Sequence, residues 1–275
     1  MISSNTKIIG NYTLFTDQMI GGGCFGEIYL GCKTTNSEEK VAIKKVSIKK
    51  LSSNDFLTYI ENEKNIFISI GSHPNIVTYY DSVILEDCFY LIIEYCPLSL
   101  SGFASKFPNK CIPEYQALTI AKDLALALKD LNSKKIIHRN LYPSNILFKD
   151  GIVKICSFSF ALKSENICEM PGLASSVGIP LFEAPEIYYK QPYSFKCDVW
   201  SLGLVLYQML YGKMPWVGKG LADLFNQINN NALVFPIEPQ VSESIKDLIK
   251  EMLAVDEVKR CNWQRVLEGT MRNED

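Results

Sequence analysis

A glycine-rich stretch near the N-terminus constrains the fold more than any other part of the sequence. Gly21, Gly23 and Gly26 have the spacing GxGxxG, and glycine lets backbone N–H groups approach phosphate oxygens closely. In a Rossmann unit this motif opens a helix, and an acidic residue follows about 20 positions later. Here residues 27–30 continue as a strand, and Lys44 comes 18 positions after Gly26 in a further strand-like run. The pattern predicts a glycine hairpin beside a strand lysine.

The hydrophobic pattern changes once along the chain. Strand-like runs dominate the first third, interrupted by a helix at about 55–70, and helical periodicity dominates after the segment 95–97. We expect an α+β protein with two lobes in a single domain, 1–275. The smaller lobe, 11–94, is an antiparallel β-sheet with one helix, and the larger lobe, 98–270, is mainly helical.

Local signals place several elements within these lobes. Apolar runs predict strands around 76–83 and 89–95. Gly71 is a helix-ending residue for the first helix. Asp150-Gly151 lies between two strand-like runs and predicts a tight hairpin.

Composition excludes several classes of protein. The apolar fraction is 47%, the net charge is −2, and basic residues are scattered, so we expect no nucleic-acid or membrane partner. No signal peptide is apparent, and no apolar run approaches the roughly 18 residues of a membrane span. The nine cysteines form no CxxC pair, which is typical of free thiols in a reducing compartment. We therefore expect a soluble cytoplasmic protein without a structural metal.

The glycine hairpin and the lysine of Val41-Ala42-Ile43-Lys44 together resemble the protein kinases. Further landmarks follow in the family's order over about residues 11–268. They are His138-Arg139-Asn140-Leu141 with Asn145 at the catalytic loop, Ser157-Phe158-Ser159 at the metal-binding DFG triplet, Ala184-Pro185-Glu186 at the end of the activation segment, Asp198 to Gly203 at its anchoring helix, and Arg260 as the partner of Glu186.

The resemblance gives Glu63 a partner. Glu63 lies on the apolar stripe that includes Phe67 and Ile70, where a carboxylate is costly unless it is paired. In the kinases such a glutamate pairs with the strand lysine, here Lys44. Glu61 is the nearest rival but falls off the stripe. The alternative is that Glu63 is a solvated residue on a surface helix.

The resemblance also implies a nucleotide site. The kinases use a glycine loop, the lysine and an apolar sandwich to hold ATP, and here no acidic residue stands in 97–101, where many kinases bind the ribose. Besides the three glycines, Lys44 and Glu63, the implied positions are the adenine-contacting Ile28, Ala42 and Leu147, the gatekeeper Ile93, and the hinge residues Glu94 and Cys96.

The catalytic positions depart from the family pattern. Asn140 replaces the aspartate that acts as base, and positioned base catalysis is worth about 10²–10⁴-fold. Ser157 replaces the aspartate that holds magnesium, and Ser159 replaces the following glycine. Tyr142 stands where a lysine contacts the γ-phosphate, and Ile179 where a threonine joins that network. Asn145 is the one ligand type that remains, so no metal is expected.

Arg139 is retained, and in the family this arginine can grip a phosphate on the activation segment. Ser164, Ser175 and Ser176 are candidate acceptors of that phosphate. The alternative is that Arg139 only packs the loop.

These features predict a pseudokinase, in which ATP is an expected ligand that binds without magnesium. We expect it to act as a signalling scaffold or allosteric module for protein partners, such as an active kinase. Glu94-Tyr95-Cys96 and the run 157–161 resemble the autophagy-initiating ULK-type kinases. Two alternatives stay open. One is a weakly active serine/threonine kinase with a non-standard catalytic loop and metal site, and the other is a different transferase with ATP in another pose.

Overall fold

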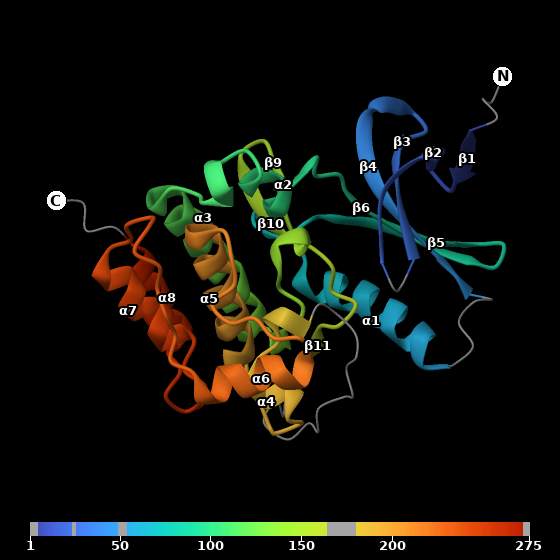
Figure 1. The fold of residues 1–275 in the computed structure, drawn as a ribbon. Helices are drawn as coiled ribbons and strands as arrows, with labels where there is room; N and C mark the ends of the chain where they lie inside the picture. The colour runs from blue at the N-terminus through green and yellow to red at the C-terminus, as the bar shows by residue number, and fades with distance from the viewer. Residues whose placement is uncertain (1–4, 24–25, 49–53, 164–179, 272–275) are drawn as a thin grey trace. The chain divides into compact units, whose positions relative to one another are not determined.

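The computed structural model describes residues 5–23, 26–48, 54–163 and 180–271 (Figure 1). The chain divides into two units between Pro97 and Leu98. The first unit consists mainly of an antiparallel sheet, and the second is mainly helical. This is the α+β class that the sequence predicts, and that prediction is confirmed.

The first unit contains one sheet of six strands, all paired antiparallel, in the order β1-β2-β3-β4-β6-β5. One face of the sheet is packed with buried side chains from β1, β2, β4 and β6, among them Ile43 and Tyr90. The elements of this unit are β1 (Thr6–Ile9), β2 (Tyr12–Gly23), β3 (Gly26–Lys33), β4 (Asn36–Ser47), α1 (Asn54–Ile70), β5 (Tyr79–Leu85) and β6 (Cys88–Glu94).

The second unit is built around helix α5 (Lys196–Tyr211). Every residue of α5 except Lys196 and Gln208 is buried, as expected for a helix that is apolar on nearly all sides. Helices α3 and α7 pack against it. The other helices and strands are β7 (Leu98–Ser99), α2 (Leu100–Ala104), α3 (Glu114–Ser133), β8 (Ile136–Ile137), β9 (Ile146–Lys149), β10 (Ile152–Ile155), β11 (Leu162–Lys163), α4 (Pro185–Tyr188), α6 (Leu221–Asn230), α7 (Glu243–Met252) and α8 (Trp263–Thr270), with short 3₁₀ turns at Pro108–Lys110, Pro143–Asn145 and Pro180–Phe182.

Two local predictions are confirmed by backbone geometry. Gly71 follows α1 with a φ of 70°, and its N–H donates to the carbonyl of Phe67, so it ends the helix as glycine commonly does. Asp150 and Gly151 have φ values of 51° and 80° and join β9 to β10 as a tight hairpin.

Two other elements differ from the sequence prediction. The strand expected at 76–83 begins only at Tyr79, because Ile76 and Val77 are buried in a loop and so extend the apolar run beyond the strand. Strand β1 was not predicted, since only one of its four residues is buried and its alternation is too short to recognise. None of the helices that the structure describes has the length and apolar character that a membrane crossing requires.

Candidate functional site

The glycine stretch forms the hairpin between β2 and β3. Gly21 lies opposite Ile28, and Gly23 lies opposite Gly26. Gly26 has a φ of 138°, and a Cβ added there would lie 2.2 Å from the carbonyl oxygen of Lys45. Only glycine fits such a position, so the close backbone packing explains this residue directly. The two residues at the tip, 24 and 25, lie outside the described part of the chain.

One face of the sheet collects the predicted nucleotide positions of the first unit. Ile28 on β3 is the cross-strand partner of Lys44 on β4, and Ala42 is the partner of Ile93 on β6. Partners in an antiparallel ladder share a face, and residues two apart on one strand do as well. Ile28, Ala42, Lys44 and Ile93 therefore lie on the same face, opposite the packed one that contains Ile43.

The ion pair expected between Lys44 and Glu63 is present. The Lys44 Nζ atom lies 2.6 Å from a carboxylate oxygen of Glu63, and the two side chains are 13% and 4% exposed. Glu61 is exposed, so the choice between the two glutamates is settled by burial. Removing one partner of a buried pair leaves an uncompensated charge, which typically costs about 3–5 kcal/mol.

Glu94 ends β6 with its side chain held by a threonine. Its carboxylate accepts hydrogen bonds from the backbone N–H of Thr78 at 3.1 Å and from the Thr78 hydroxyl at 3.2 Å. The backbone N–H of Glu94 in turn donates to the carbonyl of Thr78. Sequence reasoning missed Thr78, because the two residues are 16 positions apart and no local pattern joins them. Cys96, the second expected hinge residue, is half-buried.

In the second unit, Asp198 holds the segment predicted as the catalytic loop. Its carboxylate accepts hydrogen bonds from the backbone N–H groups of His138 and Arg139, both at 2.8 Å. Burial raises the pKa of Asp198 to about 6, although the two backbone hydrogen bonds and Arg139 act in the opposite direction. Arg139 has a φ of 61°, so the loop turns sharply at this point.

The His138 ring connects this loop to the segment that precedes Ser157. Nε2 lies 3.1 Å from the carbonyl of Cys156, and Nδ1 accepts from the N–H of Asn140 at 3.3 Å. These two contacts assign the ring proton to Nε2. The ring also lies edge-on to buried Phe158, with centroids 5.0 Å apart and planes at 86°.

Asn140 and Asn145 are linked through the backbone. The Nδ2 group of Asn145 donates to the carbonyl of Asn140 at 2.9 Å, and the carbonyl of Asn145 accepts from the N–H of Cys156. Both asparagines are nearly buried, at 9% and 7% exposed. Leu147 follows on β9, opposite Ser99 and Lys154. The loop thus keeps a fixed shape whose bonds do not depend on a carboxylate at position 140.

Ser157 stands in a backbone conformation that serine rarely adopts. Its φ is 68°, in the left-handed region that asparagine and aspartate tolerate better than other non-glycine residues. The next residue, Phe158, is fully buried, and its carbonyl accepts from the N–H of Ala161. Packing therefore holds the turn although the carboxylate is missing. Ser159, at the position of the family's glycine, is 2% exposed and has no positive φ.

Tyr142 contacts an aromatic ring near the end of the activation segment. Its ring centroid lies 6.2 Å from that of Phe182, with the planes inclined at 36°. Where the resemblance implies a lysine in a polar network, this chain has an aromatic contact. Ile179, the other altered member of that network, lies outside the described residues.

The guanidinium of Arg139 already has two partners. Nε donates to the carbonyl of Phe160, and Nη1 donates to the hydroxyl of Tyr193, both at 2.8 Å. Burial raises the pKa of Tyr193, so this hydroxyl stays protonated while it accepts that bond. These contacts give Arg139 a packing role, which the sequence left open beside the phosphate-binding one. Ser164, Ser175 and Ser176 lie outside the described residues.

The expected pair between Glu186 and Arg260 is also present. Its two hydrogen bonds measure 2.6 and 2.9 Å, and Arg260 is 1% exposed. The guanidinium lies over the ring of Trp200 at 5.1 Å. Among the residues that the structure describes, no group of three or more His, Cys, Asp or Glu side chains is arranged to hold a metal ion.

Comparison with known proteins agrees with these landmarks. The model of the protein kinase domain matches residues 15–270. The chain therefore belongs to the protein kinase family, and membership implies that it binds ATP.

The chain is related to the ATG1 and ULK serine/threonine kinases. It is 35% identical to the serine/threonine-protein kinase atg1 of Dictyostelium discoideum, over 94% of this chain and 38% of that protein. It is 32% identical to the serine/threonine-protein kinase ULK3 of Mus musculus, over 90% of this chain and 52% of that protein. A putative serine/threonine-protein kinase of Acanthamoeba polyphaga mimivirus, R517/R518, is 31% identical over 94% of this chain and 63% of that protein. The chain thus spans 38–63% of the length of these three relatives.

Proposed function

We propose that this chain is a pseudokinase domain: it binds ATP, transfers phosphate at no more than a trace rate, and acts on other proteins by binding them. The observation that carries the proposal is that the second unit keeps the structure of the catalytic loop but lacks the catalytic carboxylates. The loop that contains Asn140 keeps its hydrogen bonds, while neither Asn140 nor Ser157 supplies a carboxylate.

The missing carboxylates affect two separate steps. The neutral amide of Asn140 cannot accept the proton of a substrate hydroxyl, a loss of about 10²–10⁴-fold in rate. The hydroxyl of Ser157 is a weak ligand for Mg²⁺, a hard cation that gives up its water reluctantly. The kinases turn over at about 1–100 s⁻¹, and we expect the combined loss to be at least about 10⁵-fold.

The same substitutions favour ATP binding without a metal. In this family the strand lysine contacts the phosphates and the glycine loop offers its N–H groups, and both are retained here, while Asn140 and Ser157 carry no negative charge that would oppose the phosphates. A bound magnesium ion normally supplies charge neutralisation in this family. Here Asn145 is the one remaining ligand of the family's type. We therefore expect ATP affinity to be the same or higher when magnesium is removed.

Two measurements on the same preparation test the proposal. Calorimetric titration with ATP, in magnesium and in EDTA, should show binding in both and none after Lys44→Met. A phosphotransfer assay should show less than about one event per minute on a generic protein substrate. An affinity raised tenfold or more by magnesium, or faster turnover, would contradict the pseudokinase proposal.

A second candidate is a weakly active serine/threonine kinase, as the names of the relatives suggest. It is favoured by the intact framework: the Lys44–Glu63 pair, the edge-on contact of His138 with Phe158, and the bond from Asn145 to the Asn140 carbonyl. This candidate predicts magnesium-dependent turnover that Lys44→Met abolishes, so the same two measurements separate it from the pseudokinase.

The proposal also includes the binding partners and the cellular location. We propose protein partners, such as an active kinase, and a cytoplasmic location. Support comes from the seven free cysteines among the described residues, because free thiols are typical of a reducing compartment.

A further inference from the structure

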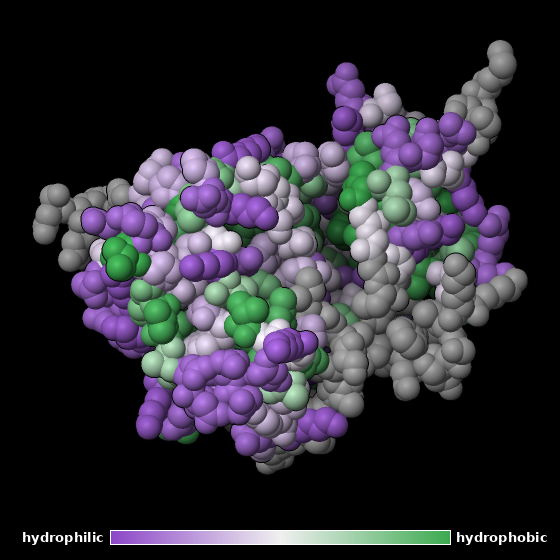
Figure 2. Space-filling model, in the orientation of Figure 1, coloured by the Kyte–Doolittle hydropathy of each residue, from purple (hydrophilic) through white to green (hydrophobic). Residues whose placement is uncertain are grey.

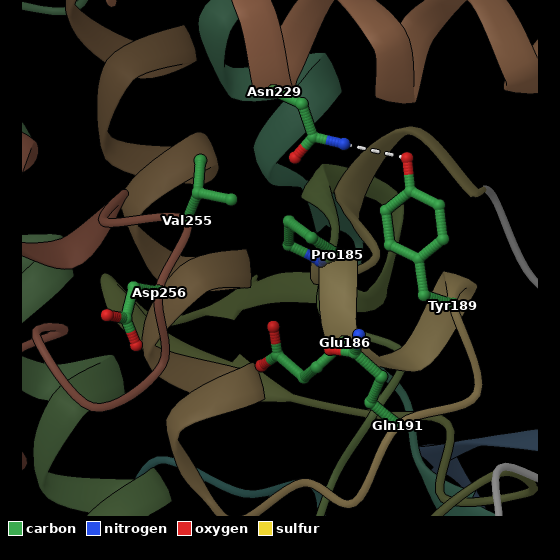
Figure 3. A pocket seen from close by; sticks show the side chains of 7 residues that line it. All are labelled: Pro185, Glu186, Tyr189, Gln191, Asn229, Val255 and Asp256. Carbon is green, nitrogen blue, oxygen red and sulfur yellow. Dashed lines mark hydrogen bonds between the residues drawn. The ribbon is translucent and has the colours of Figure 1, made fainter.

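A hollow lies in the second unit, and no residue of the catalytic loop belongs to its lining. It has a volume of about 430 Å³ and is lined by Pro185, Glu186, Tyr189, Gln191, Asn229, Val255 and Asp256 (Figure 3). These residues come from α4 and the segment after it, from α6, and from the loop after α7. Other apolar side chains of this unit, such as Val217 and Ile237, are exposed, and Figure 2 shows apolar patches in green among hydrophilic residues in purple on the face that it draws.

Contacts between neighbouring elements support the walls of the hollow. Tyr188 stacks on buried Phe225 of α6, with centroids 3.8 Å apart and planes at 11°. The hydroxyl of Tyr189, the residue after α4, accepts a hydrogen bond from Nδ2 of Asn229 of α6 at 2.7 Å (Figure 3). Arg260 fixes the carboxylate of Glu186 from behind. A site whose walls are already ordered loses little entropy when a ligand binds.

The chemistry of the lining points to a peptide. Pro185 and Val255 supply apolar atoms, while the exposed side chains of Gln191 and Asn229 supply amide groups, one of which already donates to Tyr189. Amide groups that can both donate and accept suit an extended main chain, which offers N–H and C=O groups in turn. The mixture of polar and apolar groups is less suited to a small apolar ligand, whose sites are lined mainly by hydrophobic residues.

The charges of the lining favour a basic side chain on the ligand. The hollow contains two carboxylates and no basic side chain, and Glu186 is already neutralised by Arg260. Asp256 is exposed, and its Oδ2 atom lies 3.9 Å from Nζ of Lys259, whose side chain is 80% exposed. Asp256 is therefore the acceptor that a lysine or arginine of a ligand would reach.

We propose that this hollow docks a short extended segment of a protein partner, one that places an arginine or lysine against Asp256 and an apolar side chain against Pro185 and Val255. The proposal rests on the proposed partner-binding function and gives that function a surface and a ligand chemistry. Neither ATP nor the catalytic loop takes part in it.

The test uses a phage-displayed library of random short peptides, selected on the whole chain. Selected peptides should share a basic residue next to an apolar one, and their affinity should fall about tenfold in Asp256→Asn, the loss expected for one charge-assisted hydrogen bond. This variant keeps the oxygen that accepts from the N–H of Val258, so the loop retains its turn. Tyr189→Ala, which removes one wall, should weaken binding further.

A matched control removes a carboxylate elsewhere on the same unit. Asp247, which pairs with Lys250 on α7, is 59% exposed, and Asp247→Asn should leave peptide affinity unchanged. The proposal is overturned if no peptide is enriched, if the enriched peptides lack a basic residue, or if both asparagine variants bind them as well as the unaltered chain. ATP titration of the same variants reports separately on the proposed nucleotide function, because Asp256→Asn should not change it.

Discussion

Arg260 offers the sharpest test of how the helical unit is held together. Each of its five N–H donors has an acceptor: two carboxylate oxygens of Glu186 and the backbone carbonyls of Lys196, Ala254 and Val255. Arg260→Met would leave the 4% exposed carboxylate of Glu186 without a partner. We expect a loss of about 3–5 kcal/mol in the free energy of unfolding. For a unit of this size that corresponds to a melting temperature lowered by about 6–20 °C.

The chain contains a matched control for this change. Arg265 forms the same two-bond pair with Glu251, at 2.8 and 2.9 Å, but both side chains are 40% exposed. Arg265→Met should therefore cost no more than about 1 kcal/mol. The double change Arg260→Met with Glu186→Leu should recover much of the loss, because no buried charge is left. Denaturant unfolding followed by circular dichroism measures all three. Equal losses for Arg260→Met and Arg265→Met, or no recovery in the double variant, would refute the reasoning.

Three further predictions concern the catalytic loop. The double variant Asn140→Asp with Ser157→Asp should still transfer phosphate much more slowly than an ordinary kinase. Adding Tyr142→Lys to it should raise the rate. Full activity in the double variant would show that Tyr142 matters little. Folding raises the pKa of Asp198 from 3.8 to about 6. The contribution of this carboxyl group to stability is therefore complete below pH 3.8 and is lost as the pH rises through 6. Asp198→Asn should make the free energy of unfolding depend less on pH in that window. Phosphomimetic changes at the activation-segment serines should alter stability or partner binding if Arg139 exchanges its present partners for a phosphate. In that case Arg139→Ala should abolish the effect.

Local sequence signals predicted the framework well where one residue type has a clear physical requirement. The left-handed turn at Gly151 and the close approach at Gly26 both exclude a side chain, so glycine marks them directly. The burial of Glu63 rather than Glu61 followed from helical periodicity. Sequence could not reveal the acceptors of Arg139 or the hollow beside Asp256. In the hollow, Tyr189 and Asp256 are far apart in the chain, and only the packing of α4 against α6 and the loop after α7 brings them together.

The structure also shows how this fold keeps its shape without carboxylates at positions 140 and 157. The carboxylate of Asp198 binds backbone N–H groups, and the amide of Asn145 binds a backbone carbonyl. None of these bonds uses the side chain at position 140 or 157. The loop therefore keeps the bonds that define its shape without a carboxylate at either position. The Lys44–Glu63 pair is different, because each partner is buried and depends on the other. Stability alone is thus a sufficient reason for the chain to contain that pair. A role for the pair in nucleotide recognition would require that Lys44→Met still folds but no longer binds ATP.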